Sequence, residues 1–395
     1  MVDRKIEAKT RELASQFKAL AILGPRQSGK TTLSKYVFKD KPYVSLENPD
    51  TRAFATDDPR GFLNQFPQGA ILDEIQRVPQ IFSYLQQILD EHSASGQFIL
   101  TGSNNFLLQE NISQTLAGRI AFLYLLPFSI QELRGTRMMP DNLDLAMLKG
   151  GYPPIYDRQI SPGNWYPNYI RTYVERDVRQ IKNISNLALF DRFLKLCAGR
   201  VGQLLNLNSL GIETGVDHKT ISSWISILES SFIIHLLRPH HQNYNKRLVK
   251  MPKLYFYDTG LACSLLGLQK KEHITTHPLR GSLFENFIVS EIIKNHLNEN
   301  QIGNIYFWRD HTGHEVDVII DNGRSLQPIE IKSGQTVNDD FFKGLKQWFK
   351  ISGQSKGTVI YGGQTSLTYS EGINILPWEG VTSINAEDQN RLANG

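Results

Sequence analysis

Residues 24–31 have the types and spacing of a loop that wraps phosphate groups. The segment reads GPRQSGKT and fits the pattern G-x-x-x-x-G-K-[ST], directly after the apolar run ALAIL and before a helical stretch. Glycines let consecutive backbone N–H groups face phosphate oxygens, and the start of a helix attracts the same charge. We expect Lys30 to neutralise the β- and γ-phosphates of ATP and Thr31 to hold Mg²⁺. The predicted nucleotide-binding residues are Gly24, Pro25, Arg26, Gln27, Ser28, Gly29, Lys30, Thr31 and Thr32.

An acidic pair ends the next apolar run, AILDE. Asp73 is placed to support Mg²⁺ through water, and Glu74 to orient or deprotonate the water that attacks the γ-phosphate. Such a pair is common at strand ends, but here it follows the phosphate loop in the order that ATP hydrolysis needs. The sequence therefore predicts Mg²⁺-dependent ATP hydrolysis.

Three polar residues further along are candidates for catalytic roles at the same site. Ser103 and Asn104 follow the run QFILTG, and at the same sheet edge they would either sense the γ-phosphate or form an ordinary turn. Arg119, in TLAGRIAF, is a candidate arginine finger for the ATP of a neighbouring subunit, because its planar charge can stabilise a transferring phosphoryl group. A solvated surface arginine is the alternative.

A second set of acidic residues lies toward the C-terminal end. Asp317 lies in EVDVII, and Glu330 and Lys332 in PIEIKS are two apart, so both project from one face of a strand. Two carboxylates and a lysine can bind Mg²⁺ and position water for phosphodiester cleavage, or can form a cross-strand ion pair. Glu285, in the preceding helical stretch, would complete the cluster. The predicted metal ligands of the two sites are Thr31, Asp73, Glu285, Asp317 and Glu330.

A basic stretch without acidic residues lies between Glu229 and Asp258. Its positive residues are Arg238, Lys246, Arg247, Lys250 and Lys253, and its aromatic residues include Tyr244, Tyr255 and Phe256. One interpretation is that the positive residues follow a nucleic-acid backbone while the aromatic rings stack on bases or pack beside them. The other is that the stretch forms a solvated loop whose aromatic residues belong to the core.

Apolar runs and helical stretches alternate from residue 19 to 126, which is typical of a parallel sheet with helices on both faces. Gly and Pro residues in 134–167 indicate a boundary. Residues 169–237 are mostly helical, and a turn at Gly215 predicts a helix-turn-helix, with IIHLLRP and KLYFYD as strands of a wing. A helix and four strands follow over 279–361.

Composition sets only broad limits. A chain of 395 residues suggests two or three domains, and a net charge of +4 is compatible with a nucleic-acid partner without indicating one. Cys197 and Cys263 lie in apolar segments, which predicts reduced core thiols. The longest apolar run is too short to span a bilayer and the first residues lack a signal-peptide pattern, so we expect a cytoplasmic protein without membrane contact.

Nine motifs in this order resemble those of prokaryotic AAA-type ATPases that carry a C-terminal domain of unknown function called DUF4143. They are GPRQSGKTTL, ILDEIQRVP, ILTGSNN, LAGR, YVERDV, KMPKLYFYDTGLA, FENFIVSEI, EVDVII and IEIKSG. Four residues of this chain match the Walker positions of the family, namely Lys30, Thr31, Asp73 and Glu74. Three others match its nuclease-like motif, namely Asp317, Glu330 and Lys332.

The resemblance implies an α/β protein. Its parts are an N-terminal P-loop AAA-like parallel-sheet domain, a central winged-helix segment and a C-terminal α/β domain that resembles the PD-(D/E)xK restriction-endonuclease fold. The expected boundaries are 1–133 for the ATPase core, 134–185 for a helical lid or linker, 186–262 for the winged helix-turn-helix and 263–395 for the endonuclease-like domain.

These features together predict a homo-oligomeric ATPase that binds DNA and remodels or translocates it, with a hexameric ring as one arrangement. Its C-terminal domain would bind DNA or cleave it. The alternative is an ATP-gated switch in which slow hydrolysis controls binding to DNA or a protein partner, and the nuclease-like domain is a scaffold. A protein remodeller ranks third, because no peptide-gripping pore loop can be identified.

Overall fold

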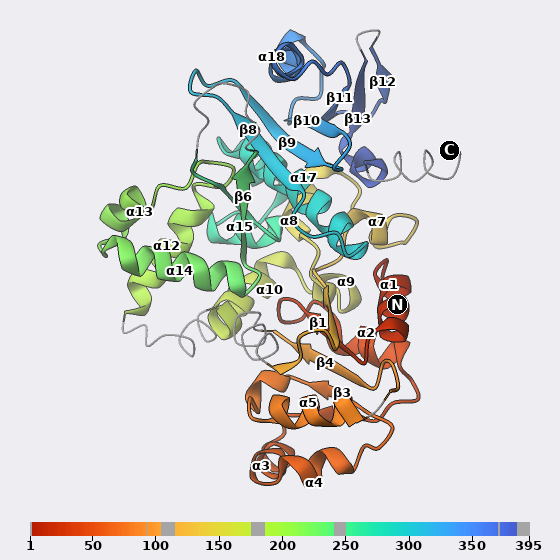
Figure 1. The fold of residues 1–395 in the computed structure, drawn as a ribbon. Helices are drawn as coiled ribbons and strands as arrows, with labels where there is room; N and C mark the ends of the chain where they lie inside the picture. The colour runs from red at the N-terminus through yellow and green to blue at the C-terminus, as the bar shows by residue number, and fades with distance from the viewer. Residues whose placement is uncertain are drawn as a thin grey trace. The chain divides into compact units, whose positions relative to one another are not determined.

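The computed structural model describes residues 2–91, 93–103, 115–174, 186–240, 250–369 and 372–384. The chain forms two compact units (Figure 1). The first contains residues 1–128, with 230–232 and 297–300, and the second contains 129–229, 233–296 and 301–395. The predicted boundaries at 185/186 and 262/263 fall inside the second unit.

A five-stranded parallel sheet, in the order β2-β3-β4-β1-β5, forms the centre of the first unit. Its strands are β1 (Ala19–Leu23), β2 (Tyr43–Ser45), β3 (Ile71–Asp73), β4 (Phe98–Gly102) and β5 (Ile120–Tyr124). Every residue of β1, β3 and β4 is buried, as expected for central strands of a parallel sheet that is covered on both faces. The predicted N-terminal parallel sheet is thus confirmed.

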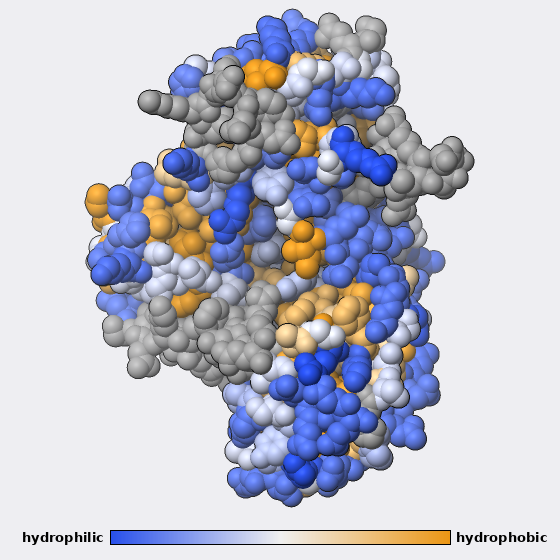
Figure 2. All heavy atoms as spheres, viewed as in Figure 1, coloured by the Kyte–Doolittle hydropathy of each residue, from blue (hydrophilic) through white to orange (hydrophobic). Residues whose placement is uncertain are grey.

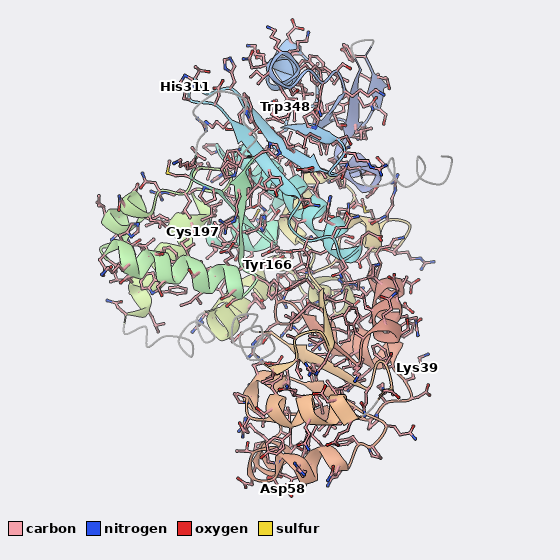
Figure 3. All side chains as sticks on the ribbon, in the orientation of Figure 1. Lys39, Asp58, Tyr166, Cys197, His311 and Trp348 are labelled. Carbon is pink, nitrogen blue, oxygen red and sulfur yellow. The ribbon has the colours of Figure 1, made fainter. Side chains whose placement is uncertain are left out.

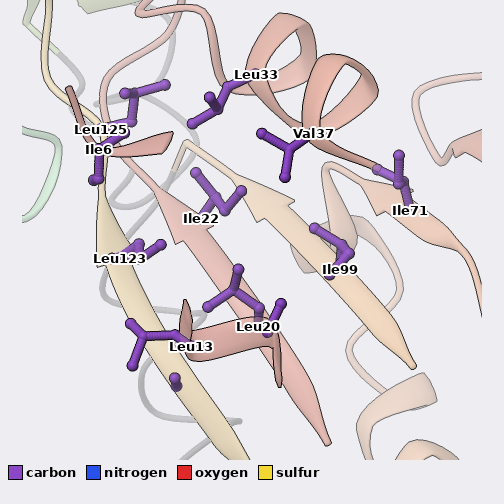
Figure 4. Packing of buried hydrophobic residues seen from close by; sticks show 12 residues of the cluster. Ile6, Leu13, Leu20, Ile22, Leu33, Val37, Ile71, Ile99, Leu123 and Leu125 are labelled. Carbon is purple, nitrogen blue, oxygen red and sulfur yellow. The ribbon is translucent and has the colours of Figure 1, made fainter. Parts of the chain in front are cut away.

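Helices between the strands cover this sheet. They are α1 (Glu7–Gln16), α2 (Lys30–Val37), α3 (Pro49–Asp57), α4 (Pro59–Asn64) and α5 (Ile81–Glu91), with a 3₁₀ turn η1 (Ile75–Arg77) after β3. Side chains of α1 and α2 pack on β1 and its neighbours in one apolar cluster, in which Leu33 and Val37 of α2 face Ile22 (Figure 4). This packing fixes α2 directly behind the loop that follows β1.

The second unit begins with helices. They are α7 (Ile130–Leu133), α8 (Leu143–Lys149), α9 (Pro153–Asp157), α10 (Pro162–Tyr169), the π-helical turn η2 (Ile170–Val174), α12 (Leu187–Ala198), α13 (Leu207–Thr214) and α14 (His218–Ser230). Tyr166, labelled in Figure 3, lies in an aromatic cluster with Tyr152, Trp165 and Tyr169, whose ring centroids lie 4.6 to 6.1 Å from that of Tyr152. Cys197 of α12 is buried, as is Cys263.

A tight turn joins α13 to α14. Gly215 ends α13 with a φ of +84°, a left-handed conformation that glycine adopts without a steric cost. Asp217 caps the next helix, accepting a hydrogen bond of 2.9 Å from the backbone N–H of Thr220. Two antiparallel strands, β6 (Ile234–Pro239) and β7 (Lys253–Phe256), follow in sequence. The helix pair and its turn are therefore local consequences of capping residues.

An eight-stranded mixed sheet completes the second unit, in the order β12-β13-β11-β10-β9-β8-β6-β7. Its further strands are β8 (Ile305–Arg309), β9 (Glu315–Asp321), β10 (Leu326–Lys332), β11 (Gly357–Tyr361), β12 (Leu367–Thr368) and β13 (Ile373–Pro377). Strand β6 pairs in parallel with β8 through Arg238 and Tyr306. The predicted wing strands thus belong to the same sheet as the C-terminal strands.

Helices flank this sheet as well. They are α15 (Thr259–Leu265), α16 (Lys271–Thr275), α17 (Arg280–Asn298) and α18 (Lys343–Ser352), with 3₁₀ turns η3 (Asp339–Phe342) and η4 (Trp378–Ser383). Trp348 of α18 is labelled in Figure 3. It packs on Trp308 of β8, with ring centroids 5.5 Å apart. Among the described residues, no helix is both long and apolar enough to cross a membrane.

Candidate nucleotide site and C-terminal acidic site

The predicted phosphate loop connects β1 to α2. Gly24 has a φ of +152°, and a Cβ atom there would lie 2.1 Å from the carbonyl oxygen of Leu125, so only glycine fits. Gly29, with a φ of +99°, precedes the first residue of α2, where no side chain caps the helix. Lys30 is buried, and its Nζ donates hydrogen bonds to the carbonyl oxygens of Gly24 (3.0 Å) and Pro25 (2.8 Å).

The residues of this loop fit the phosphates of a nucleotide. The hydroxyl of Ser28 is fully buried and has no hydrogen-bond partner in the described parts of the chain. The uncapped N-terminus of α2 supplies backbone N–H groups to an anion, and Lys30 supplies a positive charge beside them. Of the other loop residues, Arg26 forms an ion pair of 3.7 Å with Glu47, while Gln27 and Thr32 are exposed.

Arg4 supports the loop from the N-terminal segment. Its guanidinium donates to the carbonyl oxygens of Ser28 (2.8 Å) and Leu126 (2.6 Å), and it lies 4.9 Å from the centre of the Phe128 ring. A single arginine 24 positions before Ser28 carries no local signal, so the sequence does not reveal this contact.

Asp73 lies at the end of β3, next to the loop. Its Oδ2 accepts hydrogen bonds from the hydroxyls of Thr31 (3.1 Å) and Tyr43 (2.7 Å), and its Oδ1 accepts one from Thr101. Burial and the nearby Asp73 carboxylate raise the pKa of the Tyr43 phenol, so this hydroxyl stays a donor at neutral pH. The structure thus brings the predicted pair of Thr31 and Asp73 together, and adds Tyr43 and Thr101, which sequence analysis did not single out.

Glu74 follows in a left-handed backbone conformation, with φ 56° and ψ 45°. Such a conformation is uncommon for residues other than glycine. Its Oε2 accepts hydrogen bonds from the side chains of Gln76 (2.6 Å) and Ser103 (3.2 Å). Ser103 therefore lies beside Glu74, as its place at the end of β4 predicts, whereas Asn104 lies outside the described residues.

Arg119 lies at the amino ends of the strands of the same sheet, whereas the phosphate loop lies at their carboxyl ends. It directly precedes Ile120, which pairs with the first residue of β1, whereas the phosphate loop follows the last residue of β1. Its guanidinium forms a two-pronged ion pair with Asp90 of α5, at 2.5 and 2.9 Å. Within one chain, Arg119 is therefore on the opposite side of the sheet from the phosphate loop.

The predicted C-terminal residues lie together in the second unit. Lys332 forms an ion pair of 2.9 Å with Glu330, and Asp317 Oδ2 accepts a hydrogen bond of 2.8 Å from the backbone N–H of Ile331. Gly344 lies directly over Glu330, since a Cβ atom there would overlap the Glu330 carboxylate.

A second lysine, Lys253 of β7, enters this acidic cluster. Its Nζ lies 2.8 Å from Glu285 Oε1, forms an ion pair with Glu315 and is 4.0 Å from Asp317 Oδ1. Glu285 also accepts a hydrogen bond of 2.5 Å from the hydroxyl of Tyr255. Lys253 is only 2% exposed, so it is not available to a phosphate backbone as the basic-stretch interpretation supposed.

Burial and charge act in opposite directions on the pKa values of this cluster. Burial, assisted by the charge of Asp317, holds the pKa of Glu330 well above its usual range. Burial would also raise the pKa of Asp317, but Lys253 and Lys332 outweigh it and keep that pKa below its usual value. The pKa values of the two neighbouring carboxyl groups are thus moved apart, with that of Asp317 lowered and that of Glu330 raised.

A cavity of about 550 Å³ in the second unit lies between the start of α13, one face of α14 and the segment that precedes β7. Its lining is mostly apolar and includes Leu207, Ile225 and Met251. Ile212 of α13 is 83% exposed, and Figure 2 shows apolar residues gathered on the surface of this helical part. The helix pair therefore exposes apolar surface as well as polar surface.

The first unit has the features of a P-loop ATPase of the AAA type, because a parallel sheet presents a phosphate loop and an acidic strand end at one edge. Three protein-family models match the chain, described as an AAA domain (residues 16–134), a domain of unknown function, DUF8612 (140–272), and a domain of unknown function, DUF4143 (280–381). Residues 16–134 thus match an AAA domain and residues 280–381 match a DUF4143 domain, in the order that the motifs indicated. The two family matches thus confirm the resemblance to AAA-type ATPases with a C-terminal DUF4143 domain that the motifs indicated.

Known relatives extend over most of the chain. An uncharacterized protein of Mycobacterium tuberculosis is 26% identical over 391 residues, which are 98% of this chain and 86% of the relative. An uncharacterized protein of Methanocaldococcus jannaschii is 22% identical, over 81% of this chain and 75% of the relative. Among solved structures, a Walker-type ATPase of Pyrococcus abyssi is similar at 17% identity and a TM-score of 0.43, over 67% of this chain and 96% of that one.

Proposed function

We propose that this protein is a Mg²⁺-dependent ATP hydrolase that binds DNA and remodels or translocates it. The observation that carries the proposal is the contact between Thr31 and Asp73 beside a phosphate loop whose Ser28 hydroxyl has no partner among the described residues. ATP hydrolysis is mostly a matter of positioning and charge stabilisation, and these residues supply both.

Each residue of the nucleotide site has a role in this proposal. Backbone N–H groups of the loop and Lys30 bind the phosphates, while Thr31 and Asp73 hold Mg²⁺, which neutralises phosphate charge. Glu74 orients the attacking water or takes its proton. Its hydrogen bonds with Gln76 and Ser103 fix the direction of that carboxylate.

The α13–α14 pair is the proposed DNA-binding element. In a helix-turn-helix the second helix enters the major groove with its N-terminal residues on the bases. Here the start of α14 exposes His218 and Lys219, and Ser226 is exposed two turns later. Arg238 and Lys250 add exposed positive charges near the wing strands. These side chains suit hydrogen bonds to bases and phosphates.

A homo-oligomer is part of the proposal because Arg119 lies far from the phosphate loop of its own chain. An arginine finger on this edge would act on the ATP of a neighbouring subunit. A ring, with six subunits as one arrangement, would repeat this contact between successive copies.

Steady-state ATP hydrolysis tests the proposal, measured without DNA and with single-stranded, duplex or branched DNA, with Lys30→Ala as the blank. We expect hydrolysis that one DNA form stimulates and that Lys30→Ala abolishes. If the protein bound none of these DNA forms at low salt, where phosphate contacts are strongest, the DNA part of the proposal would be wrong.

A nucleotide-controlled switch is the second candidate function. The hydrogen bonds of Glu74 with Gln76 and Ser103 favour it, because a loss of these partners would turn the carboxylate away from the attacking water and slow hydrolysis. A switch would hydrolyse ATP slowly and respond little to DNA, and ATP would instead change its affinity for DNA or a protein partner. A slow rate that no DNA form changes would favour this alternative.

A further inference from the structure

The cation position of the C-terminal acidic site is already occupied by a side chain. Glu285, Glu315 and Asp317 bring one carboxylate oxygen each to within 4.8 Å of one another, a spacing that suits a metal ion. The Nζ of Lys253 lies 2.8 Å from Glu285, pairs with Glu315 and is 4.0 Å from Asp317. An ammonium group and a divalent ion cannot occupy the same space between these carboxylates.

The backbone holds Lys253 in this place. Its strand pairs with β6, where Lys253 is opposite Leu237, and on its other side it forms a bridge with Leu204. The residue is 2% exposed, and its Nζ lies 5.6 Å from the centre of the Phe307 ring. Lys253 therefore cannot leave the carboxylates by a simple rotation into solvent, because a buried ammonium without its partners costs several kcal/mol (about 3 to 5).

The other predicted ligand, Glu330, is also engaged. One of its oxygens lies 2.9 Å from Lys332 Nζ, and the other lies against the backbone of Gly344, where no room is left for even a Cβ atom. Mg²⁺ needs oxygen ligands at about 2.0 to 2.1 Å with several water molecules around it. The enclosed position of Glu330 leaves no space for that hydration shell.

We propose that Lys253 is the resident cation of the C-terminal acidic site, which holds its three carboxylates without a divalent metal and does not hydrolyse phosphodiester bonds. The lysine joins the β6–β7 hairpin, which follows the helix-turn-helix, to strand β9 and helix α17. The nuclease-like motif thus serves to fix the hairpin that accompanies the proposed DNA-binding helices. This inference does not depend on ATP hydrolysis.

Mn²⁺ binding to the full-length protein, followed by the electron paramagnetic resonance signal of free Mn²⁺ without nucleotide, tests the proposal. All proteins carry Asp73→Asn, which removes the metal ligand of the ATP site. We expect Asp73→Asn and Asp73→Asn/Asp317→Asn to bind Mn²⁺ equally. Lys253→Met keeps the length of the side chain and removes its charge. Added to Asp73→Asn, it should create one Mn²⁺ site per chain. A further Asp317→Asn substitution in that protein should abolish the new site.

Two results would overturn the proposal. The first is that the Asp73→Asn protein binds one Mn²⁺ per chain and that adding Asp317→Asn abolishes this binding. The acidic site would then bind a metal while Lys253 is present. The second is a folded Lys253→Met protein that gains no site. If Lys253→Met does not fold, Mn²⁺ binding by Asp73→Asn with and without Asp317→Asn still tests the proposal. Nicking of supercoiled plasmid DNA in Mn²⁺ is a second test, and we expect the parent protein not to nick it.

Discussion

Tyr43 and Thr31 donate hydrogen bonds to the same carboxylate oxygen of Asp73, at 2.7 and 3.1 Å. Strand β2 thus contributes to a site that otherwise comes from the loop, β3 and β4. Since a carboxylate that helps to hold Mg²⁺ acts only in one orientation, the Tyr43 hydroxyl is a positioning group for Asp73.

Tyr43→Phe should lower kcat for ATP hydrolysis by about 10- to 100-fold, because a hydrogen bond to a charged group contributes about 1.5 to 3 kcal/mol. The affinity for Mg²⁺-free ATP should not change, since Tyr43 does not contact the loop in the structure. Tyr36→Phe is the matched control, because that ring is 40% exposed and its substitution should leave kcat unchanged. An equal fall of kcat in both variants would show that Tyr43 has no specific role.

Gly24→Ala should destabilise the first unit by about 2 to 4 kcal/mol and abolish ATP binding. The added methyl group would lie 2.1 Å from the Leu125 carbonyl oxygen, in a backbone conformation that alanine rarely adopts. Gly118→Ala is the matched control, because Gly118 also has a positive φ but nothing lies within 4 Å of the added Cβ, so its cost should be about 1 kcal/mol. Calorimetric unfolding and titration with a fluorescent ATP analogue distinguish the two variants.

The arrangement of the phosphate loop and the acidic strand end could be predicted from the sequence because its signals are local. The run ALAIL, the loop and the acidic end of AILDE form one edge of a parallel sheet whenever the strands are adjacent, and β1, α2 and β3 lie as this pattern requires. Tyr43 and Thr101 escaped notice because only the order β2-β3-β4 brings their hydroxyls to Asp73. That order cannot be read from the strands individually.

The position of Lys253, in contrast, could not be predicted from the sequence. Its stretch of the sequence is basic and rich in aromatic residues, and both interpretations of that stretch, a nucleic-acid contact and a solvated loop, placed the lysine at the surface. Lysine is almost never buried unless it is paired. Its partners Glu285 and Glu315 are 32 and 62 positions away, and only the shared sheet of β7 and β9 with helix α17 brings them together. Long-range pairing of this kind leaves no signal in a single sequence.

Acidification should weaken the second unit through His235 of β6. Burial holds the pKa of His235 at about 4, below its ordinary 6.5, and the positive charge of Arg238 acts in the same direction. Tyr257 lies 3.4 Å from the same ring. The unfolded chain takes up a proton below pH 6.5 while the folded chain does not, so stability is complete above pH 6.5 and falls as the pH drops toward 4.

The variant His235→Phe removes this contribution. The difference in the free energy of unfolding between the parent protein and the variant should be constant between pH 7 and 8. Between pH 6.5 and 4 it should shift against the parent protein by no more than about 3 kcal/mol. His311→Phe is the control, because that ring is exposed at the turn between β8 and β9 (Figure 3). A pH-independent difference for His235→Phe would show that the ring has the same pKa in the folded and unfolded chains.

Arg119 offers the sharpest test of the oligomer. In one chain it pairs with Asp90 and lies at the sheet edge opposite the phosphate loop. If Arg119 acts on the ATP of a neighbour, Arg119→Ala should reduce kcat by about 10³-fold or more. Asp90→Ala breaks the same ion pair but keeps the guanidinium, so it should retain most of the activity. Equal losses in the two variants would mean that the ion pair, not a finger, is what hydrolysis requires.

Mixing two inactive proteins completes this test. Lys30→Ala subunits keep Arg119 but cannot hydrolyse their own ATP, while Arg119→Ala subunits keep an intact nucleotide site. In mixed oligomers a Lys30→Ala subunit would supply its Arg119 to the site of an Arg119→Ala neighbour, so ATP hydrolysis should reappear. With random mixing, the recovered rate should be highest near equal proportions, because the number of such neighbouring pairs is then greatest. An Arg119 that acted only within its own chain would give no activity at any ratio.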